Sequence, residues 1–520
     1  MNEKNEITMN SIADILGGHE KLIMDPVHGG IALFKHEVDV IDHPLFQRLR
    51  NICQNDILSL VFPGATHSRF LHSIGAMHVC TRMIFSMVDA YVRDRKHRKR
   101  FDFTTEHLES INYLSKVARL GCLLHDIGHA SFSHQFSKTQ KMEELVSKPD
   151  RFVQLWQGLD YNRLYTKLPQ TLEHEHYSIR CAYEVFEDIN LHEYGIDPID
   201  VLGIMETTDV RPGQAFRHFA RIFWEFIADP ASFHDTIEDT DGDERIAKMV
   251  QNFLSSIVSG EIDADRADYM LRDGFHSSVS IGSFNLDHLL SNLRFGWNLD
   301  TPWLGLAITK KGLGALEDFV YSRHQMYRQV YAHKTALGFD WILREAINEV
   351  LSDPEYYDYI DLCLSNVKDF GQLTDHFFWE AFRKISLEDT QSYSRCIIER
   401  IKLHHIDTLE DAIETEIVDK RKTLAQRIGT HYENIVTCTM KARFSTIQDD
   451  FNKIKVLVKD RISGKRQLKQ ITEISNFFTK FSDETIVHFY LKPFVTQAQK
   501  PAAISACKQQ AQSKAQPGLA

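Results

Sequence analysis

The chain lacks the cysteine patterns of a disulfide framework or of a thiolate zinc site. Its eight cysteines are spread over 520 residues, and no two of them form a CxxC pair. They are Cys53, Cys80, Cys122, Cys181, Cys363, Cys396, Cys438 and Cys507. Scattered cysteines of this kind are typical of reduced thiols in an intracellular protein.

Long hydrophobic runs and an excess of positive charge are also missing. No apolar run is long enough to span a bilayer, and residues 1–10 contain no apolar signal core. The net charge of -12 argues against a general nucleic-acid coat and against binding to anionic membranes. We therefore expect a soluble cytoplasmic protein with no membrane partner. Its length and its 43% hydrophobic content indicate a large core with two or more lobes.

What the chain does contain is a histidine-rich segment at residues 120–134. The pair His125-Asp126 is followed there by His129 and His134. An apolar helical stripe leads into the segment and consists of Leu114, Val117, Ala118, Gly121 and Cys122. His125 falls on the next step of this stripe, where an unpaired buried imidazole is costly. Two partners suit it: a metal ion that Asp126 also binds, or a backbone carbonyl, with Asp126 capping the next helix.

A second polar residue faces the same interior from a helix predicted to run from about residue 69 to 88. His72 shares one face of that helix with Gly75, Ala76 and Val79, whose small side chains allow another helix to approach closely. Arg69 lies one turn earlier and offers a cation to whatever binds there.

Segment 262–273 carries acids and arginines at helical spacing. Asp265, Asp268, Tyr269 and Arg272 lie on one side of the predicted helix. Such a row is often a salt-bridge ladder on the surface. Apolar residues tie this segment to a core, so part of it must be buried; they are Ile262, Met270 and Leu271.

Two more helices carry candidate groups whose alternatives stay open. In a helix predicted over 312–345, one face holds Arg323, Tyr327, Tyr331 and Lys334, which suits phosphates and a base, or is an exposed rim. An amphipathic helix over 45–52 has arginines beside its apolar stripe, which are either functional or solvated. Strands are expected at 456–458 and 486–491, paired across a C-terminal lobe.

Six local sequences, taken together and in order, resemble the HD-domain deoxynucleoside triphosphate triphosphohydrolases. They are Asp25-Pro-Val-His-Gly, Phe46-Gln-Arg-Leu-Arg, Phe62-Pro-Gly-Ala-Thr-His-Ser-Arg-Phe-Leu-His-Ser, His125-Asp-Ile-Gly-His-Ala-Ser-Phe-Ser-His, Asp263-Ala-Asp-Arg-Ala-Asp-Tyr and Tyr331-Ala-His-Lys. The set is similar to the branch that contains the animal SAM-and-HD-domain enzyme and its bacterial relatives. The resemblance covers about residues 22–340.

The resemblance implies a mainly α fold with four parts. These are an N-terminal lead-in at 1–20, an HD phosphohydrolase core at 21–345, a smaller C-terminal helical or mixed α+β lobe at 346–494, and a disordered tail at 495–520. It also implies one divalent metal in each active site, held by His72, His125, Asp126 and Asp265. The donor set suits Mn, Fe, Zn, Co and Mg alike. A second Mg²⁺ would arrive with the nucleotide.

The family reaction is attack of water at the α-phosphorus of a dNTP, which releases a deoxynucleoside and triphosphate. By the same resemblance, His129 and His174 act on water or phosphate beside the metal, and His134 protonates the leaving 5′-oxygen. The phosphates would be held by Arg69, Arg266, Tyr269, Arg323 and Lys334. The sugar and base would be lined by Gln54 and Tyr331.

A nucleotide-sensing site is implied as well. Asp42, Gln47 and Arg50 match a site for GTP or a dNTP activator at a subunit interface, so a homo-oligomer, either a dimer or a tetramer, is expected. Two departures from the family stand out. Ser137 replaces a usual carboxylate, for which Glu173 or Glu175 is a candidate substitute, and the stretch before His174 is longer.

Two other functions remain as alternatives to the dNTP hydrolase. One is an HD-type nuclease in which the basic run at 95–100 guides a single strand of nucleic acid. The net charge disfavours it. The other is a non-catalytic nucleotide sensor, which only Ser137 favours.

Overall fold

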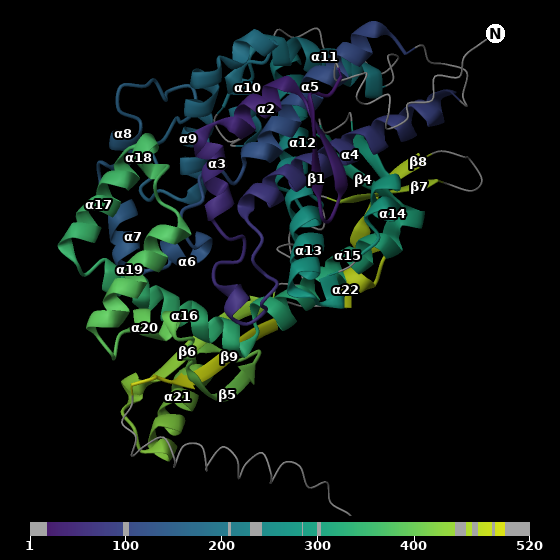
Figure 1. Ribbon diagram of the computed structural model, residues 1–520. Coiled ribbons are helices and arrows are strands. Elements are labelled where there is room, and N and C mark those ends of the chain that lie inside the picture. Colours follow the sequence, from purple (N-terminus) through teal and green to yellow (C-terminus); the bar gives the residue numbers. More distant parts are fainter. Residues whose placement is uncertain are drawn as a thin grey trace, which may run out of the picture.

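The computed structural model describes residues 18–96, 103–205, 210–228, 242–282, 284–298, 303–442, 454–459, 466–480 and 484–494. Helices dominate the fold and the sheets are small (Figure 1). The mainly α fold expected from the sequence is therefore confirmed. Most of the predicted lead-in, residues 97–100 of the basic run at 95–100 and the whole predicted tail lie outside the described residues.

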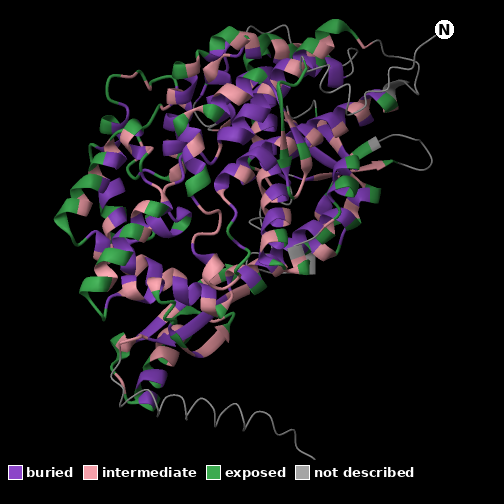
Figure 2. Cartoon of the chain, in the orientation of Figure 1, coloured by how far each residue is buried: buried purple, intermediate pink, exposed green. Residues whose placement is uncertain are grey.

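Long helices pack together in the N-terminal two thirds of the chain. They are α4 (Arg69–Lys96), α5 (Thr105–Leu124), α9 (His174–Ile189), α10 (Pro198–Met205), α11 (Gln214–Ile227), α12 (Gly242–Val258) and α13 (Ala264–Ser277). The predicted stripe on α5 is buried, and Val117 and Ala118 are fully enclosed. Figure 2 shows buried residues on the inward sides of these helices and exposed residues around the rim.

Helices α4 and α13 cross at the small residues that the sequence singled out. A Cβ atom built on Gly75 would lie 2.0 Å from Asp268 Oδ1 and 2.3 Å from Arg272 Nη2. Only glycine leaves room for these two charged side chains beside α4. The close approach brings the first turn of α4, with His72, against the first turns of α13, with Asp265.

The short helices before α4 differ from those predicted from the sequence. Helix α2 (Lys35–Asp42) precedes the predicted amphipathic segment. The single amphipathic helix over 45–52 is wrong, because α3 (Pro44–Gln47) gives way to a 3₁₀ helix (Arg48–Asn51). The long stretch before His174 contains α6 (Ser133–Ser137), α7 (Gln140–Val146) and α8 (Arg151–Leu155).

The predicted continuous helix over 312–345 is also wrong. Helix α15 (Leu313–Met326) passes into a π-helix (Tyr327–Tyr331), and α16 (Lys334–Val350) starts afresh. The Ala332 amide donates to the Tyr327 carbonyl, which closes the wider turn, and His333 Nδ1 then accepts from the Thr335 amide as the cap of α16. The four residues expected on one stripe are therefore divided between three elements.

Three small sheets complete the fold. A hairpin joins β1 (Lys21–Asp25) to β2 (Gly29–Leu33). The second sheet has the order β3-β4-β7-β8, and the third has the order β5-β9-β6. Their strands are β3 (Leu293–Asn298), β4 (Trp303–Thr309), β5 (His404–Glu410), β6 (Ile435–Ala442), β7 (Lys455–Lys459), β8 (Arg466–Gln470) and β9 (Glu484–Leu491).

The strands expected at 456–458 and 486–491 exist as β7 and β9, but their predicted pairing is wrong. β7 continues the second sheet by running parallel to β4, whereas β9 lies between β5 and β6 and is antiparallel to both. The remaining helices are α14 (Leu286–Ser291), α17 (Pro354–Ser365), α18 (Val367–Phe370), α19 (Asp375–Glu388), α20 (Tyr393–Ile398), α21 (Glu414–Ile428) and α22 (Phe477–Lys480). The predicted boundary after residue 345 falls inside α16, and the domain division stays a prediction.

Candidate active site

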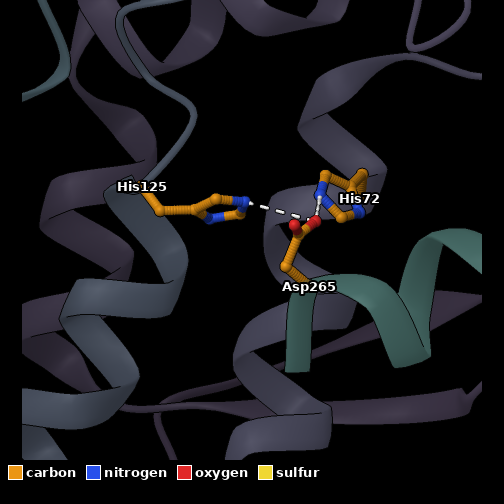
Figure 3. A group of neighbouring side chains, drawn as sticks. All are labelled: His72, His125 and Asp265. Atoms are coloured by element: carbon orange, nitrogen blue, oxygen red, sulfur yellow. Dashed lines mark ion pairs between the residues drawn. The ribbon is translucent and has the colours of Figure 1, made fainter. Parts of the chain in front are cut away.

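Three elements bring two histidines and a carboxylate together in the interior. His72 lies in the first turn of α4, His125 directly follows α5, and Asp265 lies in the first turn of α13. Their side chains point at one another, with the carboxylate of Asp265 between the two rings (Figure 3). Asp265 Oδ1 is 3.0 Å from His72 Nε2 and 3.6 Å from His125 Nε2.

The outer nitrogen of each ring is already used, which fixes how the rings face. His72 Nδ1 donates to Asp268 Oδ2 over 2.8 Å, and His125 Nδ1 donates to the Cys122 carbonyl over 2.7 Å. Both Nε2 atoms are buried and have no hydrogen-bond partner. A lone pair held toward the interior by a bond on the far side of the ring is the usual arrangement of a metal-binding histidine.

Asp126 is the fourth member of the predicted metal set, and its carboxylate lies beside the others. Its oxygens are 3.6 Å from His72 Nε2 and 3.4 Å from His125 Nε2. Asp126 also accepts a hydrogen bond from the Arg69 guanidinium. The alternative in which Asp126 caps the next helix is not found, because no side chain caps α6. The backbone-carbonyl partner considered for His125 is present, but it leaves Nε2 free for a second partner.

The charges at this point favour a bound cation. Burial lowers the pKa of His72, but Asp265 and Asp268 outweigh burial and raise that pKa to about 10. Burial raises the pKa of Asp265, but the two neighbouring imidazoles, His125 and His72, outweigh burial and lower it below its usual value. Carboxylates that hold protons on neighbouring imidazoles hold a metal ion in the same way. Two nitrogens and two carboxylates fit a divalent metal and do not select one.

A second trio of possible ligands lies next to the first. Asp126 Oδ1 is 3.3 Å from His129 Nε2, and the rings of His129 and His174 stack with centroids 4.0 Å apart. The ligand atoms of these three residues lie within 4.8 Å of one another. Asp126 therefore stands between two groups, each of which has the donors to hold a metal ion.

His134 completes a cluster of three imidazoles. Its ring is 5.2 Å from that of His129 and 5.5 Å from that of His174, nearly perpendicular to both. Burial, followed by Arg69 and the His174 imidazole, lowers the pKa of His134 to about 4, although the residue is exposed to solvent. Burial also lowers the pKa of His174 to about 4. The cluster is therefore neutral at pH 7 when no anion is bound.

Of the two candidate substitutes for a carboxylate at Ser137, one lies beside an imidazole of the cluster. Ser137 Oγ is 3.4 Å from the carbonyl of His134 and reaches no imidazole. Glu175, one of the two candidate substitutes, lies in the first turn of α9 with Oε2 3.1 Å from His174 Nδ1. Glu173 precedes that helix and forms its capping box with His176 instead.

The predicted phosphate-binding residues approach the site to different degrees. Arg69 Nε donates to Ser133 Oγ over 2.8 Å, and its guanidinium also contacts Asp126. Arg69 therefore lies directly against one of the candidate metal ligands. Arg266 is next to Asp265 and pairs with Asp263 at 3.4 Å. Arg323 is buried, and its guanidinium lies 5.6 Å from the centroid of the Tyr327 ring.

Lys334 is exposed at the first turn of α16. No hydrogen bond or ion pair among the described residues joins its ammonium group to the four candidate metal ligands. Burial raises the pKa of the Tyr269 hydroxyl. The nearby charges of Arg323 and Arg266 act in the opposite direction and do not cancel this effect.

The residues predicted to line the sugar and base are both partly enclosed. The Tyr331 hydroxyl donates to Asp273, which also binds His67 Nε2 at 2.9 Å. Gln54 Oε1 is buried and has no hydrogen-bond partner. An acceptor left open in this way is available to a bound donor.

The predicted sensing residues lie at the end of α2, at the end of α3 and in the 3₁₀ helix that follows α3. Asp42 is exposed at the end of α2. Arg50 Nε donates to Gln47 Oε1 over 2.7 Å, and its guanidinium stacks 3.5 Å above the Phe70 ring. Gln47 and Arg50 thus form one pair, in which Gln47 is half-buried and Arg50 is exposed.

Sequence reasoning missed two residues that hold the backbone just after the His125-Asp126 pair. Arg48 is buried, so the solvated alternative is wrong for it; its guanidinium donates to the carbonyls of Ile127 at 2.6 Å and His129 at 2.8 Å. Asp375, the first residue of α19, accepts from the Phe132 amide at 2.9 Å and the Cys53 amide at 2.8 Å. Both act on backbone groups far away in sequence, for which the sequence holds no local signal.

Fold and site together define a mainly helical protein with a buried group of histidines and carboxylates at its centre that could hold a metal ion. No protein-family model matches the chain. Among curated proteins, the uncharacterized protein YwfO of Bacillus subtilis is 27% identical over 77% of this chain and 69% of its own length. The deoxynucleoside triphosphate triphosphohydrolase SAMHD1 homolog of Dictyostelium discoideum is 25% identical over 76% of this chain and 60% of its length. Human SAMHD1 is 25% identical over 69% of this chain and 50% of its length.

These matches support the resemblance of this chain to the HD-domain deoxynucleoside triphosphate triphosphohydrolase family, which the ordered motifs predicted. The chain spans about half to two thirds of the length of the curated relatives it matches. Two solved structures share the fold over 91–94% of this chain, at 22% identity. One is a hypothetical protein from Aquifex aeolicus with a TM-score of 0.60, and the other is a phosphohydrolase from Bacteroides thetaiotaomicron with a TM-score of 0.57.

Within the described residues, no helix combines the length and apolar character that a membrane crossing requires.

Proposed function

We propose that this protein is a metal-dependent hydrolase that converts dNTPs to deoxynucleosides and triphosphate. The observation that carries the proposal is the pair of buried, unpartnered Nε2 atoms of His72 and His125, which converge on Asp265 beside Asp126. The similarity to named dNTP triphosphohydrolases supports this substrate class. The metal, when bound by these four residues, would supply Lewis acidity at phosphate.

In this proposal the chain's own residues bind the nucleotide and move the protons. Arg69, Arg266 and Arg323 bind the triphosphate, with Tyr269 and Lys334 beside it. Gln54 and Tyr331 contact the sugar and base. Water attacks the α-phosphorus, the bond from phosphorus to the 5′-oxygen breaks, and the deoxynucleoside leaves.

The imidazole cluster has the groups for both proton transfers. His129 and His174 are neutral at pH 7, so either can take the proton of the attacking water. His134 gives a proton to the 5′-oxygen, which is a poor leaving group as an alkoxide. Bound triphosphate brings several negative charges next to His134 and thereby raises its low pKa toward the working range.

We further propose that the protein is a homo-oligomer, a dimer or a tetramer, in which GTP or a dNTP binds at Asp42, Gln47 and Arg50. The exposed Arg50 supports this site, since its guanidinium, which stacks on the Phe70 ring and is oriented by Gln47 Oε1, can bind a nucleotide phosphate. Light scattering with and without GTP tests whether nucleotide binding drives assembly of the oligomer. The Arg50→Ala variant should lose any nucleotide-driven assembly.

A product assay tests the proposed reaction. Purified protein is mixed with Mn²⁺ and each dNTP, with and without GTP, and the products are separated by ion exchange. Deoxynucleoside with intact triphosphate supports the proposal. The variants His125→Ala and Asp126→Ala should lose both turnover and Mn²⁺ binding, whereas His192→Ala, an exposed histidine outside the site, should keep both.

Two results would move the assignment to the other functions. Metal-dependent cleavage of single-stranded DNA or RNA that is lost in His125→Ala would support the nuclease. Nucleotide-driven assembly with no turnover under any metal would support the sensor.

A further inference from the structure

The turn between α15 and α16 carries two of the residues proposed to hold the nucleotide, Tyr331 and Lys334. We refer to residues 327–334 as the substrate corner. Its π-helix and the two residues after it are irregular, and a stretch of irregular backbone needs partners from outside to hold one shape.

Strand β9 supplies these partners from the far end of the chain. His488 Nε2 donates to the Ala332 carbonyl over 3.0 Å, and the Tyr490 hydroxyl donates to the Lys334 carbonyl over 2.5 Å. The two residues are two apart on one strand, so they face the same side of the sheet, toward α16 (Figure 1). Both are buried, with 7% and 1% of their surfaces exposed.

The bonds around His488 fix its tautomer. The Ala332 carbonyl can only accept, so the proton of the neutral ring is on Nε2 and Nδ1 is an acceptor. Nδ1 then accepts a hydrogen bond from the Thr408 hydroxyl over 2.8 Å, and Thr408 Oγ1 accepts in turn from His405 Nε2 over 3.0 Å. The chain of bonds runs from β5 through β9 to the substrate corner.

Packing holds the two rings where these bonds form. The rings of His405 and His488 have centroids 5.2 Å apart, and His405 and Tyr490 have centroids 5.5 Å apart. A Cβ on Gly338 of α16 would already lie 3.4 Å from the Tyr490 ring. The sheet and helix are therefore in contact, and a shift of β9 moves the carbonyls to which it is bonded.

We infer that His488 and Tyr490 are positioning residues, through which the C-terminal sheet sets where the Tyr331 ring and the Lys334 ammonium meet the nucleotide. The inference rests on the proposed function for the role of those two side chains. It does not rest on that function for the bonds themselves. Its consequence is that nucleotide affinity depends on a strand that touches no substrate.

Three variants test the inference: His488→Gln, His488→Asn and Tyr490→Phe. In His488→Gln the side-chain amide nitrogen reaches the place of Nε2 and can still donate to Ala332. In His488→Asn the amide reaches only the place of Nδ1, so the bond to Ala332 is lost. We expect His488→Asn and Tyr490→Phe to raise the KM for dNTP about tenfold with kcat nearly unchanged, and His488→Gln to stay close to wild type.

Val487→Ala is the matched control for general loosening of the strand. Val487 is fully buried on the opposite face of β9 and packs in the separate cluster with Ile406 and Leu424. It should lower the melting temperature without raising KM. The inference is overturned if His488→Asn and His488→Gln have the same KM, or if Val487→Ala raises KM as much as His488→Asn.

Hydrogen exchange gives a second measurement that needs no activity. Without nucleotide, the amides of 327–337 should exchange faster in His488→Asn than in wild type, and at the wild-type rate in His488→Gln. Equal rates in all three proteins overturn the inference. If the wild-type protein hydrolyses no dNTP while this exchange pattern is found, the proposed function fails and the positioning by β9 stands.

Discussion

His134, the proposed proton donor to the leaving 5′-oxygen, has a low pKa for that role. Burial and the Arg69 guanidinium hold it at about 4, so without an anion nearby the ring is neutral at pH 7. The proposed reaction needs the protonated ring only when triphosphate is bound. This makes His134 a test of transition-state chemistry rather than of binding.

The variant His134→Gln should keep its KM within a few fold and lose about 100-fold in kcat at pH 7.5, which is the usual effect of removing a general acid. Steady-state kinetics with the preferred dNTP measures both constants. Metal binding should not change, because the proposed ligands are untouched. A large rise in KM at constant kcat would assign His134 to substrate binding instead.

Asp200 links pH to the stability of the helical core. It is fully buried, and its carboxylate accepts from the Tyr113 hydroxyl at 2.5 Å and the Gly213 amide at 2.6 Å. Burial outweighs these bonds and raises the pKa of Asp200 to about 6. The folded state thus keeps a proton that the unfolded chain loses near pH 4, so the free energy of unfolding falls as pH rises between these values and the loss is complete above pH 6.

The variant Asp200→Asn stays neutral at every pH and should escape this loss. Relative to wild type, its free energy of unfolding should improve by about 2 kcal/mol between pH 4 and pH 7. Urea unfolding at a series of pH values measures the difference. Asp353→Asn, at the exposed cap of α17, is the control and should show no such trend. A difference between Asp200→Asn and wild type that is constant with pH would contradict the assignment.

At the residue scale, the sequence revealed groups whose chemistry is local and missed groups that act on distant backbone. His72, His125 and Asp265 stand in motifs with helical spacing, so their convergence was predictable, and whether they bind metal stays a prediction. Arg48 and Asp375 could not be found in this way. Nothing near Asp375 in the sequence indicates that its partners are the amides of Cys53 and Phe132.

At the element scale, the crossing of α4 and α13 determines whether His72 is oriented. Gly75 leaves space for Asp268, which binds His72 Nδ1 and also accepts from Arg272 Nε at 2.9 Å. A methyl group at Gly75 must displace that carboxylate or push α13 away. Either change removes the support on the outer nitrogen of His72.

The variant Gly75→Ala should therefore melt at a lower temperature and bind Mn²⁺ at least tenfold more weakly, the usual cost of losing a partner behind a metal-binding histidine. Calorimetry measures both effects. Gly314→Ala is the matched control, because nothing lies within 4 Å of its added methyl group in α15. It should stabilise the protein by about 0.5–1 kcal/mol and leave Mn²⁺ affinity unchanged. Equal Mn²⁺ affinity in the two variants would contradict the role of the crossing.

Helices and strands were predictable where one hydrophobic period runs through the whole segment. Interruptions within a helix and the pairing of distant strands were missed. The apolar stripe of α5 runs without interruption, and both the helix and its burial were foreseen. The segment 313–350 keeps helical composition throughout, so the sequence does not mark the π-helix that divides it. The strands β7 and β9 were recognisable from their apolar runs, but their partners depend on where distant strands leave an open edge.

At the scale of the whole molecule, β9 holds the C-terminal sheet together. β5 and β6 each pair with β9 and not with one another. Val487, Phe489 and Leu491 are buried beneath α21, and burial of each such side chain is worth about 1.5–3 kcal/mol. Loss of β9 thus removes both the hydrogen bonds and much of the apolar core of this sheet.

A chain that stops after Lys480 should lose the C-terminal sheet and bind nucleotide poorly. Circular dichroism and thermal unfolding should report a lower melting temperature and less strand than in wild type. A chain that stops after residue 494 keeps β9 and is the control; it should resemble the full-length protein. If the shorter chain melts and binds as the control does, β9 is dispensable and the positioning by His488 is wrong.

The central place of β9 also bears on how the protein is made. A ribosome synthesises β5 and then β6 before it reaches the strand that must lie between them. Until residue 491 has left the exit tunnel, the nascent chain presents two strands with unpaired edges, which are the kind of surface on which chains aggregate. Production of this protein should therefore respond to slower translation, to lower temperature and to chaperones that cover exposed strand edges.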